Sequence, residues 1–136
     1  MEAAAVRRPL ALTMVGAEIP VLVTAELEYQ AADPYAITAV FHTDAGQIRW
    51  VFSRDLLDEG LVHDVGDGDV QVAPSSDDLG EHSVQLRLSS PDGVAVLETA
   101  ADVILDFLER SYALVPPGAE SSYLGLDNAL TSLLDR

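Results

Sequence analysis

The sequence predicts an α+β fold, with mainly antiparallel β-sheets followed by C-terminal helices. Apolar and polar residues alternate at period two through much of the first two thirds of the chain. The connections between these runs are too short for the crossovers that parallel strands need. The last third changes to helical spacing. Strands first and helices last are typical of α+β domains with an antiparallel sheet.

The expected strands begin after residue 20. Asp44-Ala45-Gly46 is a hairpin signal, and Pro91-Asp92-Gly93 predicts a tight turn. One or two helical turns are expected over 54–59, ended by Gly60. The residues before 16 are assigned no element. The expected strands are residues 21–29, 35–41, 48–52, 61–65, 70–73, 84–88 and 94–97.

Two helices are expected near the C-terminus. Thr99, with Asp102 three residues later, resembles a capping box at the start of the first helix. Pro116-Pro117-Gly118 ends this helix. One face of the first helix carries the residues Val103, Ile104, Phe107, Leu108 and Tyr112. The apolar stripe of the second helix consists of Leu126, Leu130, Leu133 and Leu134.

The length of 136 residues suits a single domain, residues 1–136, and no linker divides it. The chain carries 23 acidic residues against seven arginines and no lysine, for a net charge of -16. Because phosphate binding needs clustered cations, nucleic acid and anionic lipid are disfavoured as partners. Without cysteine, a disulfide scaffold, a zinc–thiolate site and a cysteine nucleophile are excluded. No apolar run is long enough to span a membrane, so a cytoplasmic protein without membrane insertion is expected.

No pattern predicts a catalytic site, a metal site or a cofactor. His42, His63 and His82 are about 20 residues apart and lack the spacing of metal ligands. Asp67 opens an acidic, glycine-containing turn, but Val72 stands where a calcium loop needs glycine. Local hydrogen bonding in a turn is the interpretation that this segment favours.

Candidate interface residues lie in three places. Trp50, in an apolar strand, is interpreted as a core side chain, with an oligomer or partner interface as the alternative. Tyr35 follows Asp33-Pro34 and is expected either in the core or as an exposed anchor. The stripe of the last helix must cover its own fold, a sister subunit or a partner. Its residues are Leu126, Leu130, Leu133 and Leu134.

The ordered set of short motifs along the chain resembles the SsgA-like proteins of sporulating actinomycetes, from about residue 20 to 134. The N-terminal residues 1–16 match loosely, and Ser111 and Gly125 depart from the family pattern, which leaves the subfamily open. The segments that carry the resemblance are residues 27–29, 33–37, 41–43, 50–57, 60, 66–70, 72, 74, 88–93, 107–110, 115–118 and 120.

The resemblance implies a non-enzymatic adaptor at the septum in sporulation-specific cell division. It would position or stabilise the septum and the FtsZ ring through contacts with FtsZ or other SsgA-like proteins. It also implies two packed antiparallel sheets resembling the Whirly fold, and a homo-oligomer, expected to be a trimer. Two alternatives stay open: a Whirly-like single-stranded nucleic-acid-binding module, and a small hydrolase or isomerase using Asp and His.

Overall fold

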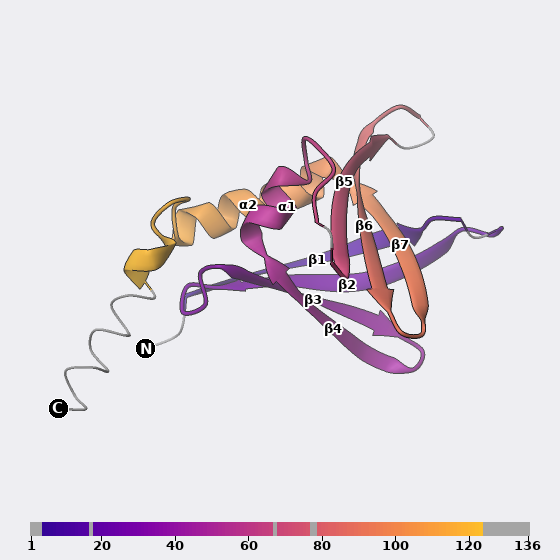
Figure 1. Ribbon diagram of the computed structural model, residues 1–136, viewed down its shortest axis with the longest axis horizontal. Helices are drawn as coiled ribbons and strands as arrows, with labels where there is room; N and C mark the ends of the chain where they lie inside the picture. Colours follow the sequence, from indigo (N-terminus) through magenta and orange to yellow (C-terminus); the bar gives the residue numbers. More distant parts are fainter. Residues whose placement is uncertain (1–3, 17, 67, 77–78, 124–136) are drawn as a thin grey trace.

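The computed structural model describes residues 4–16, 18–66, 68–76 and 79–123. Within these ranges, seven strands form one antiparallel sheet in the order β4-β3-β2-β1-β7-β6-β5, and two helices follow strands (Figure 1). The predicted α+β fold with a mainly antiparallel sheet is therefore confirmed. The elements are β1 Ala5–Met14, β2 Val21–Gln30, β3 Ala36–Thr43, β4 Gly46–Ser53, α1 Arg54–Glu59, β5 Val70–Ser76, β6 His82–Ser90, β7 Gly93–Ala100 and α2 Ala101–Leu114.

The sheet bends sharply between its two halves. β1 pairs with β2 along ten residues, but with β7 only at Thr13–Glu98 and Met14–Leu97. Figure 1 shows β5, β6 and β7 crossing over the half made of β1 to β4. The two packed sheets that the resemblance implied are thus two halves of one continuous sheet, whereas the likeness to the Whirly fold stays a prediction.

The middle strand of the sheet, β1, is absent from the sequence-based prediction. Its inward-facing positions follow period two, with Val6 and Leu12 buried. Arg8 occupies one of these positions, and Pro9 follows it, so the run does not look like a strand. The structure accommodates the arginine because its Nε donates to Asp106 Oδ2 of α2 at 3.1 Å.

The core lies between the inner face of the curled sheet and α2. Ile104, Phe107 and Leu108 of the helix are buried, as the helical spacing predicts. Figure 1 shows α2 beside β1 and β2, with α1 close to its middle. The strand residues that meet in this core include Leu12, Leu27, Tyr29, Ile37, Phe41, Phe52, Val72, Leu86 and Leu97.

Two local predictions are wrong. Residues 61–65 form no strand, and only Val65 bridges to Val72. Thr99 does not cap α2, since it lies in β7 and its hydroxyl donates to the Ala11 carbonyl oxygen at 3.2 Å. Thr99 instead pairs with Val84 of β6, so sheet pairing overrides the local preference for a helix cap.

The helix over 54–59 is confirmed, with Gly60 after it. Gly60 has a φ of -66°, which any residue can adopt. A Cβ at this position would overlap the Val72 side chain. The close packing of α1 on β5, rather than a left-handed turn, is therefore what requires glycine here.

Candidate functional site

The three histidines lie in two strands and one loop. His42 and His82 are exposed at strand ends, and His63 lies in the loop after α1. Among the described residues, no three His, Asp or Glu side chains lie close enough to hold a metal ion. None of the described helices is long and apolar enough to cross a bilayer. Asp67, of the acidic turn, lies outside the described residues.

A buried arginine lies at the junction of β4 and α1. Ser53 ends β4 and caps α1, because its Oγ accepts from the Leu56 N–H at 3.0 Å. This cap fixes the start of the helix and places the next residue, Arg54, in the interior, where it is 1% exposed. A buried guanidinium needs partners for its donors, since an unpaired buried charge is costly.

The guanidinium of Arg54 connects three separate segments. Its Nη1 donates to the carbonyl oxygens of Ser111 at 3.2 Å and Val115 at 2.8 Å. Its Nη2 donates to Glu120 Oε2 at 2.9 Å. Glu120 also accepts from the Gly118 N–H at 2.8 Å. One side chain therefore satisfies carbonyls at the end of α2 and fixes the turn that follows it.

Two tyrosines enclose the same guanidinium. Its Cζ lies 4.7 Å from the ring centroid of Tyr29 and 4.9 Å from that of Tyr112, which are cation–π distances. Burial raises the pKa of Tyr29 to about 12, although the Arg54 charge opposes this shift. Burial, with the nearby Asp58 carboxylate, raises the pKa of Tyr112 to about 12. Both phenols are therefore neutral at physiological pH.

The carboxylate of Glu120 is held in its charged form. The hydrogen bond from Arg54 lowers the pKa of this group, and backbone hydrogen bonds act in the same direction. Among the described atoms, Arg54 Nε is the buried donor that has no hydrogen-bond partner. Such a buried and nearly satisfied ion pair stabilises the arrangement of the segments that it joins.

This cluster lies close to the last described residues of the chain. Residues 120–123 are helical, and they begin with Glu120, the partner of Arg54. The candidate stripe of that helix lies outside the described residues, namely Leu126, Leu130, Leu133 and Leu134. Sequence reasoning did not pair Arg54 with Glu120, because they are 66 residues apart and no local spacing connects them.

Tyr35 is exposed beside the arginine cluster. Its side chain is 44% exposed, so the interpretation that placed it in the core is wrong. Its carbonyl oxygen accepts from the Arg54 N–H at 2.8 Å, and the carbonyl of Pro34 accepts from the Tyr29 hydroxyl at 2.9 Å. The backbone of this turn is therefore rigid, and it presents the ring of Tyr35 to solvent.

Trp50 lines an open apolar groove. It is half-buried against the core, on the inner face of β4 next to Ile48. Both side chains form one wall, and Leu88 and Ala95 of the β6–β7 hairpin form the other. The groove has a volume of about 530 Å³, within the range of ligand and peptide pockets. Trp50 thus belongs partly to the core and partly to an accessible surface.

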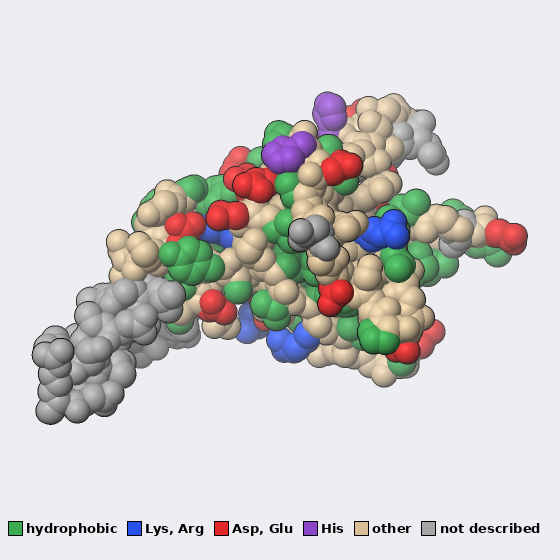
Figure 2. Space-filling model, in the orientation of Figure 1, with side chains coloured by type: hydrophobic (Ala, Val, Ile, Leu, Met, Phe, Trp, Pro, Cys, Tyr) green, Lys and Arg blue, Asp and Glu red, His purple; other side chains and the backbone are tan. Residues whose placement is uncertain are grey.

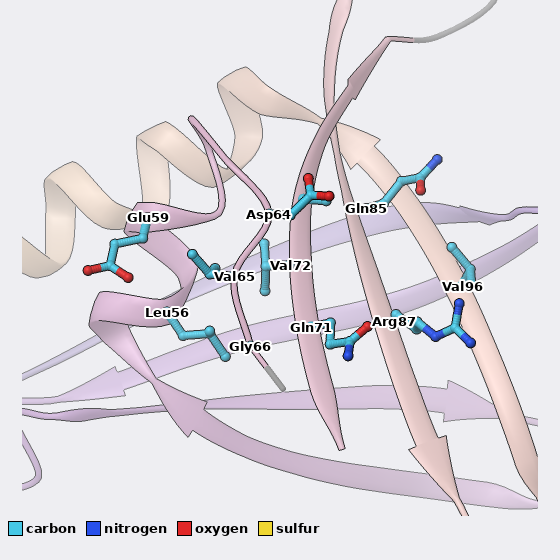
Figure 3. Close-up of a pocket in the computed structure, with 11 residues that line it drawn as sticks. Leu56, Glu59, Asp64, Val65, Gly66, Gln71, Val72, Gln85, Arg87 and Val96 are labelled. Carbon is cyan, nitrogen blue, oxygen red and sulfur yellow. The ribbon is translucent and has the colours of Figure 1, made fainter. Parts of the chain in front are cut away.

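A second hollow, of about 570 Å³, lies between α1, the segment before β5, and the outer face of β5 and β6 (Figure 3). In Figure 3, Leu56 lies between Glu59 on one side and Gln71 and Arg87 on the other. Gln85 is engaged elsewhere, since its Nε2 donates to Glu98 Oε2 at 2.8 Å. The polar groups of this hollow do not converge on one point, so the groove at Trp50 is the better candidate.

Comparison with known proteins decides the family. The profile of the family described as "Streptomyces sporulation and cell division protein, SsgA" matches residues 23–120. The chain belongs to the SsgA family. The resemblance noted in the sequence is thereby confirmed, and Arg54 and Glu120 both fall within the matched residues.

Relatives named "Sporulation-specific cell division protein SsgB" match most of the chain. The protein from Kineococcus radiotolerans is 50% identical over 123 residues, covering 90% of this chain and 73% of its own. The protein from Saccharopolyspora erythraea is 48% identical over 117 residues, covering 85% of this chain and 80% of its own. This chain is thus similar to SsgB proteins along nearly its whole described length.

Solved structures of the SsgA family share the fold. One is described as "Mutations in SsgB correlate to longitudinal cell division during sporulation of Streptomyces coelicolor". Its TM-score is 0.84 at 46% identity, covering 89% of this chain and 96% of that one. An SsgA-like sporulation-specific cell division protein from Thermobifida fusca gives a TM-score of 0.87 at 36% identity, covering 96% of both chains.

Proposed function

We propose that this protein is a non-enzymatic adaptor in sporulation-specific cell division, which positions or stabilises the septum and the FtsZ ring through protein–protein contacts. The family match over residues 23–120 carries the proposal, since relatives are named sporulation-specific cell division proteins. The site is consistent with it. The buried ion pair of Arg54 and Glu120 stiffens the body, and the apolar groove at Trp50 offers a surface of the kind that proteins bind.

Charge supports a protein partner over a nucleic acid. The net charge is -16, and Figure 2 shows acidic side chains spread over the visible face with few basic ones among them. Single-stranded nucleic acid needs a basic groove lined with aromatic rings. A strongly negative surface instead attracts basic segments of proteins and repels phosphate. The nucleic-acid-binding alternative is therefore disfavoured.

The proposal includes self-assembly, most simply as a trimer, and contact with other SsgA-like proteins. Tyr35 and the stripe at Leu126, Leu130, Leu133 and Leu134 stay candidate surfaces for this assembly. Light scattering on the purified protein measures the mass directly. About three times the 14.5 kDa of one chain is expected, and a monomer at high concentration contradicts the assembly.

Localisation tests the proposed function. A fluorescent fusion of this protein is imaged in sporulating hyphae together with a differently coloured FtsZ fusion. The expected result is a ladder of foci that coincides with the FtsZ rings during sporulation septation. Diffuse fluorescence while the FtsZ ladders form normally contradicts the adaptor role.

A further inference from the structure

The two edges of the sheet differ in protection. At the β5 edge, the Val65 N–H donates to the Val72 carbonyl at 2.9 Å, and the Val72 N–H donates back at 3.0 Å. Pro74 removes one further donor from the same strand. At the other edge, no segment of the described ranges pairs with the free side of β4. Among the described residues, one edge is therefore covered and the other is open.

The open strand has the properties that favour pairing. β4 is paired with β3 in regular register along all eight residues, from Ala36–Ser53 to Thr43–Gly46. Its apolar side chains are accessible, with Val51 62% and Ile48 47% exposed. Arg49 is its single charged residue, and β4 contains no proline. Natural proteins normally protect an exposed edge with charges, prolines or bulges, so an unprotected edge of this length indicates an association site.

The apolar groove runs beside this edge. Ile48 and Trp50 lie on the inner face of β4 and form one wall of the groove. Figure 1 shows the β6–β7 turn next to the β3–β4 turn, which agrees with Leu88 and Ala95 forming the opposite wall. A strand added to β4 would turn every second side chain toward this inner face. Backbone pairing and apolar pockets for alternate side chains are the two parts of β-strand recognition.

We propose that the β4 edge and the adjoining groove bind an extended segment of a partner protein as an added strand, with alternate apolar side chains in the groove and basic residues at its ends. This inference rests on the proposed adaptor function and names the chemistry of the partner segment.

Charge identifies the occupant. Asp44 precedes β4, Asp55 follows it, and Asp92 lies on the opposite wall of the groove, all three exposed. Lys or Arg flanking an added strand would meet a carboxylate at either end. A second copy of this chain is disfavoured. Antiparallel pairing of two β4 strands about their centre brings Asp44 of one copy opposite Asp55 of the other, and parallel pairing sets each Asp beside itself.

A phage-displayed library of random dodecapeptides, selected on the full chain, tests the proposal. The enriched sequences are expected to alternate apolar residues, to lack proline in the middle, and to carry Lys or Arg at the ends. A synthetic peptide of the enriched sequence is then titrated by NMR. The expected shifts and amide protection fall on β4 and spare β5. Methylating alternate backbone nitrogens of the peptide should weaken binding at least about tenfold, because each one removes a ladder hydrogen bond.

Matched variants locate the binding. Ile48→Asp places a carboxylate in the groove wall and should weaken the peptide at least about tenfold. Val62→Asp adds the same charge at a 74% exposed valine outside the groove and should leave affinity unchanged. The proposal is overturned if acidic peptides are enriched or if no peptide is enriched. It is also overturned if the two variants change peptide affinity equally. A concentration-dependent dimer in sedimentation that Ile48→Asp abolishes also overturns it, since the occupant is then a second copy.

The two proposals can fail separately. If the wild-type fusion forms septal ladders but β4 selects no peptide, the adaptor role stands and the strand-binding site is refuted. If β4 binds basic-flanked peptides as expected but the fusion stays diffuse, the site stands and the role in septation is refuted.

Discussion

Replacing Arg54 with methionine removes the charge that joins β4–α1 to the end of α2. Methionine keeps an apolar stem of similar length between Tyr29 and Tyr112. The hydrogen bonds to the Ser111 and Val115 carbonyls are lost, and so is the ion pair with Glu120. The Glu120 carboxylate, which is 7% exposed, then keeps only its backbone hydrogen bonds, those with Gly118 and with Glu120 itself, among its described partners.

The expected loss in the free energy of unfolding is about 3–5 kcal/mol, the range for removing one partner of a buried ion pair. Most of this cost comes from the carboxylate left without its counterion. The double variant Arg54→Met with Glu120→Gln removes the stranded charge, while the amide oxygen can still accept from Gly118. It should therefore be more stable than the sum of the two single variants predicts, by at least about 1 kcal/mol.

Urea unfolding followed by circular dichroism measures all four proteins of this cycle. The slope of the free energy against urea should stay constant, so that midpoints report stability. Val62→Asp is the control for a surface change, with an expected effect within about 0.5 kcal/mol. If Arg54→Met lowers the free energy of unfolding by less than about 1 kcal/mol, the ion pair does not stabilise the fold as described. Additive effects of the two single variants would contradict the account in the same way.

Four further predictions address other parts of the molecule. Trp50→Ala should lower the free energy of unfolding in urea by about 1.5–2.5 kcal/mol, roughly half the cost for a fully buried aromatic. A loss of about 3–5 kcal/mol would place the ring wholly in the core. The hydrogen bond from Arg54 lowers the pKa of Glu120 below its ordinary 4.5. The stability advantage of wild type over Glu120→Gln should therefore be complete above pH 4.5 and decline as the pH falls through the lower, folded-state pKa. An advantage that grows with acid would contradict this sign. Gly66→Ala should destabilise by at least about 1–2 kcal/mol in the same assay, because Gly66 has a φ of +94° and a Cβ would overlap the Val70 carbonyl oxygen. A neutral effect would show that the backbone at this position relaxes freely. Fluorescence anisotropy with a labelled single-stranded oligonucleotide should show no submicromolar binding at physiological salt, whereas tight binding that weakens with added salt would restore the nucleic-acid alternative.

The strands that the sequence could predict are those whose two faces differ. In β2 and β3, inward positions such as Leu27 and Phe41 are buried, and outward positions such as Glu28 and His42 are not, so period two is visible. β1 lacks this contrast, since Arg8 faces inward and finds its partner Asp106 on α2. That compensation is tertiary, and no window of local sequence contains it.

The candidate site was predictable only in part. Trp50 was singled out as a large aromatic in an apolar strand, and Tyr35 as a tyrosine beside the rigid proline of a turn. Their exposure depends on which strands lie opposite, and it could not be read from spacing. The ion pair of Arg54 and Glu120 joins residues 66 positions apart. Its only local sign is a lone arginine directly after the apolar strand β4, which is also typical of a solvated helix start.

Deletion of the gene tests the central claim most directly. Septa are counted by membrane and cell-wall staining in aerial hyphae of the deletion strain and of the strain with the gene restored. The account predicts that the deletion strain grows vegetatively, forms aerial hyphae, and lacks regularly spaced sporulation septa, which return with the gene. Sporulation septa of normal number and spacing in the deletion strain would contradict it.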